Sequence, residues 1–304
     1  MIATADRQDA QWLNRHSYPF TPNYLQVEGG RMHYVDQGQG EPIVFVHGTP
    51  TWSYLFRHLI RDLSADGYRC VAPDHIGFGL SEKPADFSYS PGALTRNLGK
   101  LIDELDLHDI TLVIHDFGGP IGMGYAVDHP ERIKRIVLLN TWVGDVSKEP
   151  AAEKIGKMAV GPLGKFLYLS SLSGPKMIKP LFVDRDKYTE EIQNAYFGPF
   201  LRKEDRHGTF ALAKHLIESS AWFNEIWSCR EVLLGKQMML LWGMKDPTFG
   251  EKTLNRIWHE FPLAEVHTLK DAGHFALEEN PRQVLNFMRD FLKMTASAST
   301  GYLS

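Results

Sequence analysis

The chain has 304 residues, of which 43% are hydrophobic and 23% charged, a composition typical of a globular protein with one large domain or one domain that carries an insertion. The formal net charge of −4 excludes the clustered positive charge that binding to a nucleic-acid backbone requires. Apolar runs such as residues 238–242 are far shorter than the ~20 residues of a membrane helix. We therefore expect neither a nucleic-acid nor a membrane partner.

Short β-rich runs alternate with helix-forming stretches along most of the chain. The first two runs, residues 24–28 and 31–36 around Gly29 and Gly30, predict an antiparallel hairpin at a sheet edge. Six later β-rich runs are strand candidates, at residues 43–46, 70–72, 111–114, 136–139, 238–242 and 265–269. Continuous apolar runs of this length, such as residues 43–46 and 238–242, are typical of strands that helices cover on both faces. Helices are predicted between them at 52–66, 93–107, 120–129 and 252–261. The pattern indicates an α/β protein with a mostly parallel, doubly wound sheet.

The alternation is interrupted between about residues 145 and 236, where the sequence is helical in character and no comparable strand run occurs. A plain loop of this length is uncommon in a compact domain. The interruption predicts a helical cap domain at residues 145–236, inserted after the sixth strand. Residues 1–144 and 237–304 then form the core domain.

The segment TLVIHDFGG at residues 111–119 joins a strand to a helix through a tight turn that carries Asp116. Glycines at such a turn permit close backbone approach, and the residue before them is presented above the sheet edge, where nucleophile-elbow enzymes hold their nucleophile. We expect the Asp116 side chain to be exposed there. The alternative, which this segment alone leaves open, is that Asp116 caps the helix beginning near Pro120.

Two further polar residues follow later strand runs, and a third run ends in a loop of similar interest. Asp246 and His274 lie just beyond the last two runs, and the carboxyl ends of strands hold the sites of open α/β sheets. The sequence HGTP at residues 47–50 stands where such hydrolases take one backbone N–H of an oxyanion hole. Singly, Asp246 reads as a turn residue and His274 as a surface histidine. Their coincidence with Asp116 favours one site.

Five stretches of the sequence resemble the α/β-hydrolase superfamily and, within it, the haloalkane dehalogenases. They are VHGTPTWSYLFR (46–57), PDHIGFGLSEKP (73–84), HDFGGPIG (115–122), WGMKDPTF (242–249) and DAGHFALEENP (271–281). The stretch YFGPF at 196–200 is also similar. The likeness extends from about residue 24 to about residue 291, and it is stronger in the core than in the cap.

The resemblance implies a role for each candidate residue. Asp116 would be the nucleophile, His274 the base, and Asp246 the acid that orients His274. Some family members carry this acid after the sixth strand, but residues 139–143, LNTWV, offer no carboxylate, so Asp246 is preferred. The backbone N–H groups of Phe117 and Thr49 would hold the oxyanion.

The nucleophile type constrains the reaction independently of the family. Aspartate attack on an acyl carbon would give a labile anhydride, so Asp116 suits displacement at an sp³ carbon that bears a halide or an epoxide oxygen. Water activated by His274 would then hydrolyse the alkyl ester, for the overall reaction R–X + H₂O → R–OH + HX. The partners are a small apolar substrate and water, with no metal and no organic cofactor. The inner face of the cap, at residues 158–168, 177–182 and 210–222, is expected to be apolar and to select that substrate.

Two positions depart from the dehalogenase pattern. Dehalogenases typically bind the departing halide with an indole N–H after the nucleophile and with an Asn amide or a second Trp, whereas this chain has Phe117 and Thr49 at the two positions. Phe offers no donor and Thr only a hydroxyl. An indole from elsewhere, at Trp52, Trp142, Trp222 or Trp227, could replace the missing donor. The candidate pocket residues are His47, Trp52, Trp142, Tyr168, Tyr196 and Trp222.

Three other functions remain open. An epoxide hydrolase would share the Asp–His–Asp set and would protonate its leaving group from cap tyrosines, for which Tyr168, Tyr188 and Tyr196 are candidates. A β-lactone-cleaving enzyme is also similar in residues 73–84 and in the placement of the acid. A ligand-binding protein without activity on the same fold is the third, and the complete Asp–His–Asp set argues against it.

The remaining residues predict location and assembly. Cys70 and Cys229 are too few for a disulfide framework and are expected to be inert buried thiols. The first sixteen residues mix charges and lack the apolar run of a secretory signal, so we expect a cytoplasmic protein, a monomer or a small homo-oligomer. The histidines that show no metal-ligand spacing are expected at the surface or as caps, at His33, His75, His129 and His207.

Overall fold

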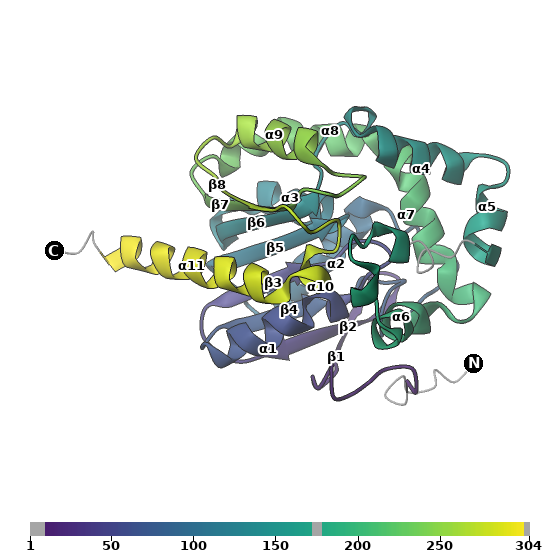
Figure 1. The fold of residues 1–304 in the computed structure, drawn as a ribbon, viewed down its shortest axis with the longest axis horizontal. Helices are drawn as coiled ribbons and strands as arrows, with labels where there is room; N and C mark the ends of the chain where they lie inside the picture. The colour runs from purple at the N-terminus through teal and green to yellow at the C-terminus, as the bar shows by residue number, and fades with distance from the viewer. Residues whose placement is uncertain (1–9, 172–177, 301–304) are drawn as a thin grey trace.

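A single eight-stranded sheet forms the centre of the computed structural model, which describes residues 10–171 and 178–300 (Figure 1). The strands lie in the order β1-β2-β4-β3-β5-β6-β7-β8. Their bounds are β1 Asn23–Val27, β2 Gly30–Gln37, β3 Pro42–Val46, β4 Arg69–Pro73, β5 Ile110–Asp116, β6 Ile133–Thr141, β7 Gln237–Gly243 and β8 Glu265–Leu269. β2 pairs antiparallel with β1 and β4, and the other pairs are parallel. The predicted edge hairpin and mostly parallel sheet are confirmed.

Helices cover both faces of the sheet. Figure 1 shows α1 and α11 side by side, and both pack on one face, while α2, α3 and α9 pack on the other. Their bounds are α1 Arg57–Ala65, α2 Pro91–Glu104, α3 Gly118–Asp128, α9 Glu251–Glu260, α10 Ala276–Glu279 and α11 Pro281–Thr300. The sequence pattern missed α10 and α11. It also placed the start of α3 two residues late, because the chain turns directly from Asp116 into the helix.

Successive side chains of the central strands enter opposite cores, as the two-residue period of a strand requires. In β5, Leu112 and Ile114 face the α2, α3 and α9 layer, and Val113 faces the α1 and α11 layer. Because both faces are covered, neither set of side chains needs to be polar. This explains why the central strands read as nearly continuous apolar runs, whereas the edge strand β8 (EVHTL) is only partly buried and contains polar residues.

The chain between β6 and β7 forms a group of helices, hereafter the helical segment (residues 145–236). Its described part contains no strand, and its helices are α4 Pro150–Val160, α5 Gly164–Phe166, α6 Glu190–Phe197, α7 His207–Glu218 and α8 Ser220–Ser228. α4 packs closely on α7, where a Cβ at Gly156 would lie 2.8 Å from Ile217 Cγ1. Figure 1 shows α4, α5, α6 and α7 grouped beyond one end of the sheet.

Three expectations about burial are wrong. Cys70 is buried, and burial raises the pKa of its thiol, but Cys229 is exposed because it follows the last turn of α8. His33 and His75 are buried rather than at the surface. His33 Nδ1 lies 2.8 Å from Asp74 Oδ2, and His75 Nε2 donates to the His47 carbonyl at 3.1 Å. Both rings therefore stabilise loops that follow strands. None of the described helices has the length and apolar character to cross a membrane.

Candidate active site

Asp116 ends β5 in a conformation that L residues seldom adopt. Its φ is +53°, in the left-handed region, at a cost of about 1–3 kcal/mol for a residue other than glycine. The Thr141 hydroxyl donates to the Asp116 carbonyl oxygen at 2.5 Å and so holds the turn. A Cβ at Gly118 would lie 2.0 Å from the Val46 carbonyl oxygen, so only glycine permits this approach of α3 to β3. Backbone strain of this kind clusters at functional sites.

The Asp116 carboxylate is held from the loop after β3. The Thr49 N–H donates to Asp116 Oδ1 at 2.7 Å. A Cβ at Gly48 would lie 2.0 Å from that oxygen and 2.5 Å from the Phe117 nitrogen, so glycine is required here as well. With this loop against it, the Asp116 side chain is buried, with 8% of the residue exposed. The expectation of an exposed side chain is therefore wrong, because the turn presents Asp116 to a loop rather than to bulk solvent.

His274 lies between two carboxylates. Its Nδ1 is 2.8 Å from Asp246 Oδ2, and its Nε2 is 3.6 Å from Asp116 Oδ2. Asp246 Oδ1 accepts the backbone N–H groups of Thr248 at 2.7 Å and Phe249 at 3.1 Å. The turn that follows β7 therefore fixes the carboxylate that in turn fixes the imidazole. The three residues that the sequence grouped are together in space.

Charge and burial act against each other at this cluster. Burial alone would lower the pKa of His274, but the carboxylates of Asp246 and Asp116 outweigh it and raise this pKa to about 10. Burial would raise the pKa of Asp246, but the His274 imidazolium and the hydrogen bonds to the carboxylate lower it. The unmodified site therefore favours an imidazolium between two carboxylates.

Two supporting residues escaped the sequence analysis. Asn140, at the end of β6, donates from Nδ2 to Asp246 Oδ2 at 3.0 Å and accepts the Gly243 N–H on Oδ1 at 2.8 Å. His115 donates from Nε2 to the His274 carbonyl at 2.8 Å. Burial lowers the pKa of His115 to about 4, so its ring is neutral. The position of His115 beside Asp116 was visible in the sequence, but nothing there indicated its partner.

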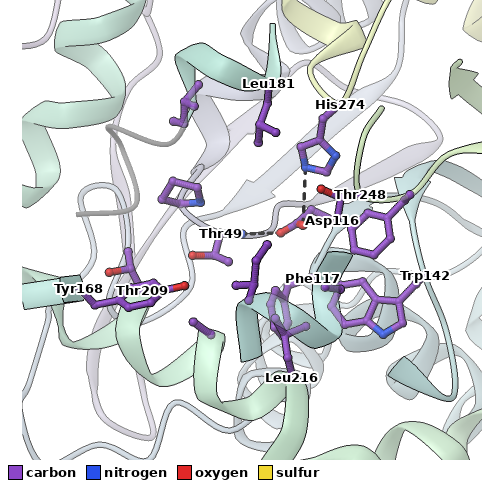
Figure 2. Close-up of a pocket in the computed structure, with 16 residues that line it drawn as sticks. Thr49, Asp116, Phe117, Trp142, Tyr168, Leu181, Thr209, Leu216, Thr248 and His274 are labelled. Atoms are coloured by element: carbon purple, nitrogen blue, oxygen red, sulfur yellow. Dashed lines mark hydrogen bonds and ion pairs between the residues drawn. The ribbon is translucent and has the colours of Figure 1, made fainter. Parts of the chain in front are cut away.

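A cavity of about 100 Å³ opens in front of Asp116 (Figure 2). Its polar lining residues are Thr49, Asp116, Tyr168, Thr209, Thr248 and His274. The other lining residues are Pro50, Phe117, Trp142, Ala152, Ile155, Ile178, Leu181, Ala213, Leu216 and Phe249. Figure 2 places Asp116 and His274 at one end of the cavity and Tyr168 and Thr209 at the other. The lining thus joins a charged end to a largely apolar body.

Only part of the predicted pocket lines this cavity. Trp142 and Tyr168 do, and all three predicted cap stretches contribute, although Met177 at the start of one lies outside the described residues. His47, Trp52, Tyr196 and Trp222 do not. His47 Nδ1 donates to the Gly48 carbonyl at 2.7 Å, and Trp222 packs beside Gly92 and Gly124, so these side chains shape loops and helix contacts instead.

Indole and phenol groups are scarce at the cavity. Trp52 donates from Nε1 to the Ala195 carbonyl at 3.0 Å, away from the cavity. Trp142 Nε1 is buried without a hydrogen-bond partner in the described chain, and Figure 2 shows it on the edge of the ring farther from Asp116. The Tyr196 hydroxyl donates to Glu278 Oε1 at 2.6 Å, and Tyr188 packs on Phe182. Of these three tyrosines of the helical segment, Tyr168 alone is a lining residue.

Within residues 10–171 and 178–300, no group of three or more His, Cys, Asp or Glu side chains is arranged to hold a metal ion. The cluster at Asp116 is instead a linear array of two carboxylates joined through an imidazole. Such an array supports nucleophilic and general-base chemistry.

Comparison with known proteins identifies the family of the chain. The family profile of the α/β-hydrolase fold matches residues 41–281. The chain belongs to this family and, within it, to the haloalkane dehalogenase-like enzymes. The predicted fold class and family resemblance are confirmed.

Relatives similar to this chain carry two different names. The chain is 33% identical over 299 residues to a cis-3-alkyl-4-alkyloxetan-2-one decarboxylase of Shewanella oneidensis, a match that covers 93% of this chain and 91% of the relative. It is 33% identical over 271 residues to haloalkane dehalogenase 2 of Mycobacterium tuberculosis, covering 88% and 93%. The crystal structure of the haloalkane dehalogenase DatA from Agrobacterium tumefaciens superimposes with a TM-score of 0.80 at 26% identity, covering 90% of this chain and 97% of that one.

Proposed function

We propose that this enzyme uses Asp116 as a nucleophile on small, largely apolar electrophiles and forms a covalent ester that water then cleaves. The observation that carries the proposal is that the two oxygens of the Asp116 carboxylate have different contacts. Thr49 N–H binds Asp116 Oδ1 at 2.7 Å, while Oδ2 faces His274 Nε2 at 3.6 Å and remains available for attack. A helix cap would not require this arrangement.

In the first half-reaction Asp116 Oδ2 attacks an sp³ carbon. The new O–C bond forms as the bond from carbon to the leaving group breaks, and the leaving group departs with the electron pair. No proton moves in this step when the leaving group is a halide. The product is an ester whose carbonyl oxygen is Oδ1, already bound to the Thr49 N–H.

In the second half-reaction His274 activates water. Ester formation removes the negative charge of Asp116, one of the two charges that hold the proton on His274, so the imidazole loses that proton more readily. Neutral His274 accepts a proton from water, whose oxygen attacks Cγ of Asp116. The oxyanion forms on Oδ1 between the N–H groups of Thr49 and Phe117. The Cγ–Oδ2 bond then breaks, and the alcohol leaves with the proton that His274 accepted from water.

The helical segment supports the choice of substrate. We propose that residues 145–236 act as a cap domain over the core formed by residues 1–144 and 237–304. Ile155, Leu181 and Leu216 come from three separate parts of this segment and line the cavity with aliphatic surface. Each buried methylene of a substrate chain gains about 0.8 kcal/mol there. Small to mid-sized apolar chains therefore fit best.

The site departs from the dehalogenase pattern at the two positions that would bind the leaving group. Phe117 and Thr49 stand where a dehalogenase would carry its halide donors, and the Trp142 indole nitrogen is turned away from Asp116 (Figure 2). Among chloride, bromide and iodide, chloride depends most on hydrogen-bond donors and should therefore be the slowest to leave. Bromoalkanes and iodoalkanes are the preferred haloalkane substrates.

The same deficit favours a second candidate, the opening of a β-lactone. Attack at the sp³ ring carbon breaks the ring C–O bond and releases a tethered carboxylate, driven by ring strain rather than by halide donors. Subsequent loss of CO₂ with release of Asp116 would give an alkene. The name of the Shewanella oneidensis relative describes that protein as a decarboxylase of a four-membered lactone, a cis-3-alkyl-4-alkyloxetan-2-one. An epoxide substrate is less well supported, since only Tyr168 of the three cap tyrosines lines the cavity.

Trapping the intermediate tests the proposal. A His274→Phe variant is incubated with 1-bromohexane, 1-chlorohexane, 1,2-epoxyhexane or a cis-dialkyl β-lactone, and the protein and the volatile products are analysed by mass spectrometry. We expect a hexyl adduct on Asp116 from the bromide. The epoxide would add its whole mass, and the lactone would add its whole mass or yield an alkene.

The control for this experiment is Asp116→Asn, which should give no adduct with any substrate. An adduct that maps to another residue, or the absence of adduct and product with all four compounds, would overturn the assignment of Asp116 as nucleophile.

A further inference from the structure

One short stretch of the helical segment contacts the loop that carries His274 from both sides. Leu181 lines the cavity, and its carbonyl oxygen lies 2.9 Å from where a Cβ on Gly273 would be. On the other side of His274, the ring of Phe182 stacks on that of Phe275, with centroids 5.3 Å apart and planes at 21°. The residues before and after His274 therefore rest on consecutive residues of the helical segment.

A buried carboxylate joins the same two parts of the chain. Glu279 Oε1 accepts the N–H groups of Val183 at 2.7 Å and Asp184 at 3.0 Å, and Oε2 accepts the Gly273 N–H at 2.7 Å. Only 3% of Glu279 is exposed. Three N–H donors on one buried carboxylate form strong, charge-assisted bonds. Glu279 thus ties the peptide that precedes His274 to the peptides that follow Leu181 and Phe182.

We propose that Glu279 is a positioning residue for His274, and that it transmits the placement of the cap stretch 181–184 to the imidazole. The inference rests on the proposed function, because it assigns Glu279 to the half-reaction in which His274 activates water. A carboxylate suits this position because both oxygens accept. Glutamine supplies one acceptor oxygen and one NH₂ group, so in either orientation it faces an N–H donor with another donor.

The two half-reactions depend on His274 differently, and this gives the proposal a specific signature. Asp116 Oδ2 attacks without a base, and Asp116 is held by Thr49 and Thr141 rather than by the loop of His274. Ester hydrolysis requires His274 Nε2 at hydrogen-bond distance from a water that is aligned with Cγ of Asp116. A displaced loop should therefore slow hydrolysis and leave alkylation nearly unchanged.

The test is Glu279→Gln assayed with 1-bromohexane in a rapid-quench experiment. We expect the bromide burst to keep its rate and amplitude, while steady-state turnover falls by about 10- to 100-fold, the effect of a small misplacement of a reacting group. The alkyl ester on Asp116 should accumulate in mass spectra. Equal slowing of burst and steady state, or unchanged turnover, would overturn the proposal.

Glu149→Gln is the matched control. Glu149 is also a buried carboxylate that joins the helical segment to the core, accepting from the Thr253 hydroxyl at 2.6 Å and from Arg256, but its hydrogen bonds do not reach the loop of His274. A general loss of packing between cap and core should affect both variants alike. The burst signature should appear for Glu279→Gln only.

Two further experiments test the proposal if turnover cannot be measured or if Glu279→Gln folds poorly. Titration of the His274 imidazole by NMR should show a shifted midpoint in Glu279→Gln and none in Glu149→Gln, and identical midpoints in all three proteins would count against the proposal. Gly273→Ala leaves Glu279 in place but sets a Cβ against the Leu181 carbonyl, so it should reproduce the selective slowing of hydrolysis. If the wild-type enzyme gives neither a burst nor turnover with any electrophile, the proposed function fails, and the NMR titration still decides the positioning role.

Discussion

Asp116, Asp246 and His274 each lie within five residues of a strand end. The side chains that the helical segment contributes to the cavity come instead from α4, α7 and several short turns. The first group is held by hydrogen bonds, such as the 2.8 Å contact of His274 with Asp246. The second group meets mainly through apolar packing, as where α4 contacts α7. The proposed function places the chemistry at the sheet edge and substrate choice in the helical segment.

The two regions also differ in the effect of substituting one of their side chains. A hydrogen-bonded array loses its function when one donor or acceptor changes, because the remaining buried groups are left unpaired. An apolar lining changes shape and selectivity when a side chain changes, but seldom loses its capacity altogether. The predictions below address first the sheet edge and then its boundary with the helical segment.

The largest effect is expected at the proposed nucleophile, Asp116. Asp116→Asn should reduce turnover by about 10⁴-fold or more, because an amide does not displace the leaving group. Asparagine tolerates the left-handed conformation that Asp116 adopts at φ +53°, so the fold should persist. The checks are turnover of 1-bromohexane and the thermal unfolding midpoint of the same sample. Loss of the near-ultraviolet circular dichroism signal in the variant would instead support a purely structural role for Asp116.

The next effect concerns Asp246 and its neighbour Asn140. Asp246→Asn should slow ester hydrolysis by up to about 10⁴-fold, because an amide no longer selects the productive tautomer of His274. Asn140 Nδ2 lies 3.0 Å from Asp246 Oδ2, so exchanging amide and carboxylate within the pair keeps one negative charge beside the imidazole. The double variant Asn140→Asp/Asp246→Asn should therefore recover part of the lost rate in single-turnover assays. Asn140→Asp alone is the control, and a double variant no faster than Asp246→Asn would argue against this exchange.

The local features of the sheet edge could be predicted from the sequence, whereas the tertiary contacts and the lining of the helical segment could not. Strand ends, the glycine-bounded turn at Asp116 and the order of Asp116, Asp246 and His274 are local signals, and the structure places these residues in contact. The bond that His115 donates to the His274 carbonyl and the bonds that Glu279 accepts from the Gly273 and Val183 N–H groups are tertiary, and no short motif encodes them.

The helical segment was harder to predict for a physical reason. Some of its lining residues lie in elements of only three to five residues, such as Tyr168 in Leu167–Ser171 and Leu181 in Lys179–Leu181, so the apolar period that distinguishes a lining side chain from a packing one has little length in which to appear. Tyr196 of this segment and Trp52, which precedes the four-residue helix Ser53–Phe56 outside it, illustrate how hard this distinction is. Both are aromatic, buried and similar in type to pocket residues, but their polar atoms bond to Glu278 and to the Ala195 carbonyl outside the cavity.

At the boundary between the two regions, Phe117→Trp tests the leaving-group site. Phe117 lines the cavity and packs edge-on against Trp142 at 4.8 Å. An indole N–H at this position would supply a donor to a departing chloride and should raise the rate with 1-chlorohexane by up to about 10²-fold, with a smaller gain for the bromide. The measurement is the burst rate of halide release. Efficient dechlorination by the wild-type enzyme, not improved in Phe117→Trp, would show that another group already binds the halide.

The smallest expected effect is the contribution of the buried charge array to stability. The folded-state pKa of His274 is raised to about 10, above the usual value of 6.5, so between these values the folded protein binds a proton that the unfolded chain does not. Stability from this source is complete below about pH 6.5 and is lost as the pH rises toward 10. Urea unfolding at several pH values should therefore show the wild-type advantage over His274→Gln shrinking across this window. The exposed His259, replaced in a His259→Gln control, should show no such trend. A wild-type advantage that grows with pH would mean that the folded protein holds His274 neutral, and the ester would then not be needed to release its proton.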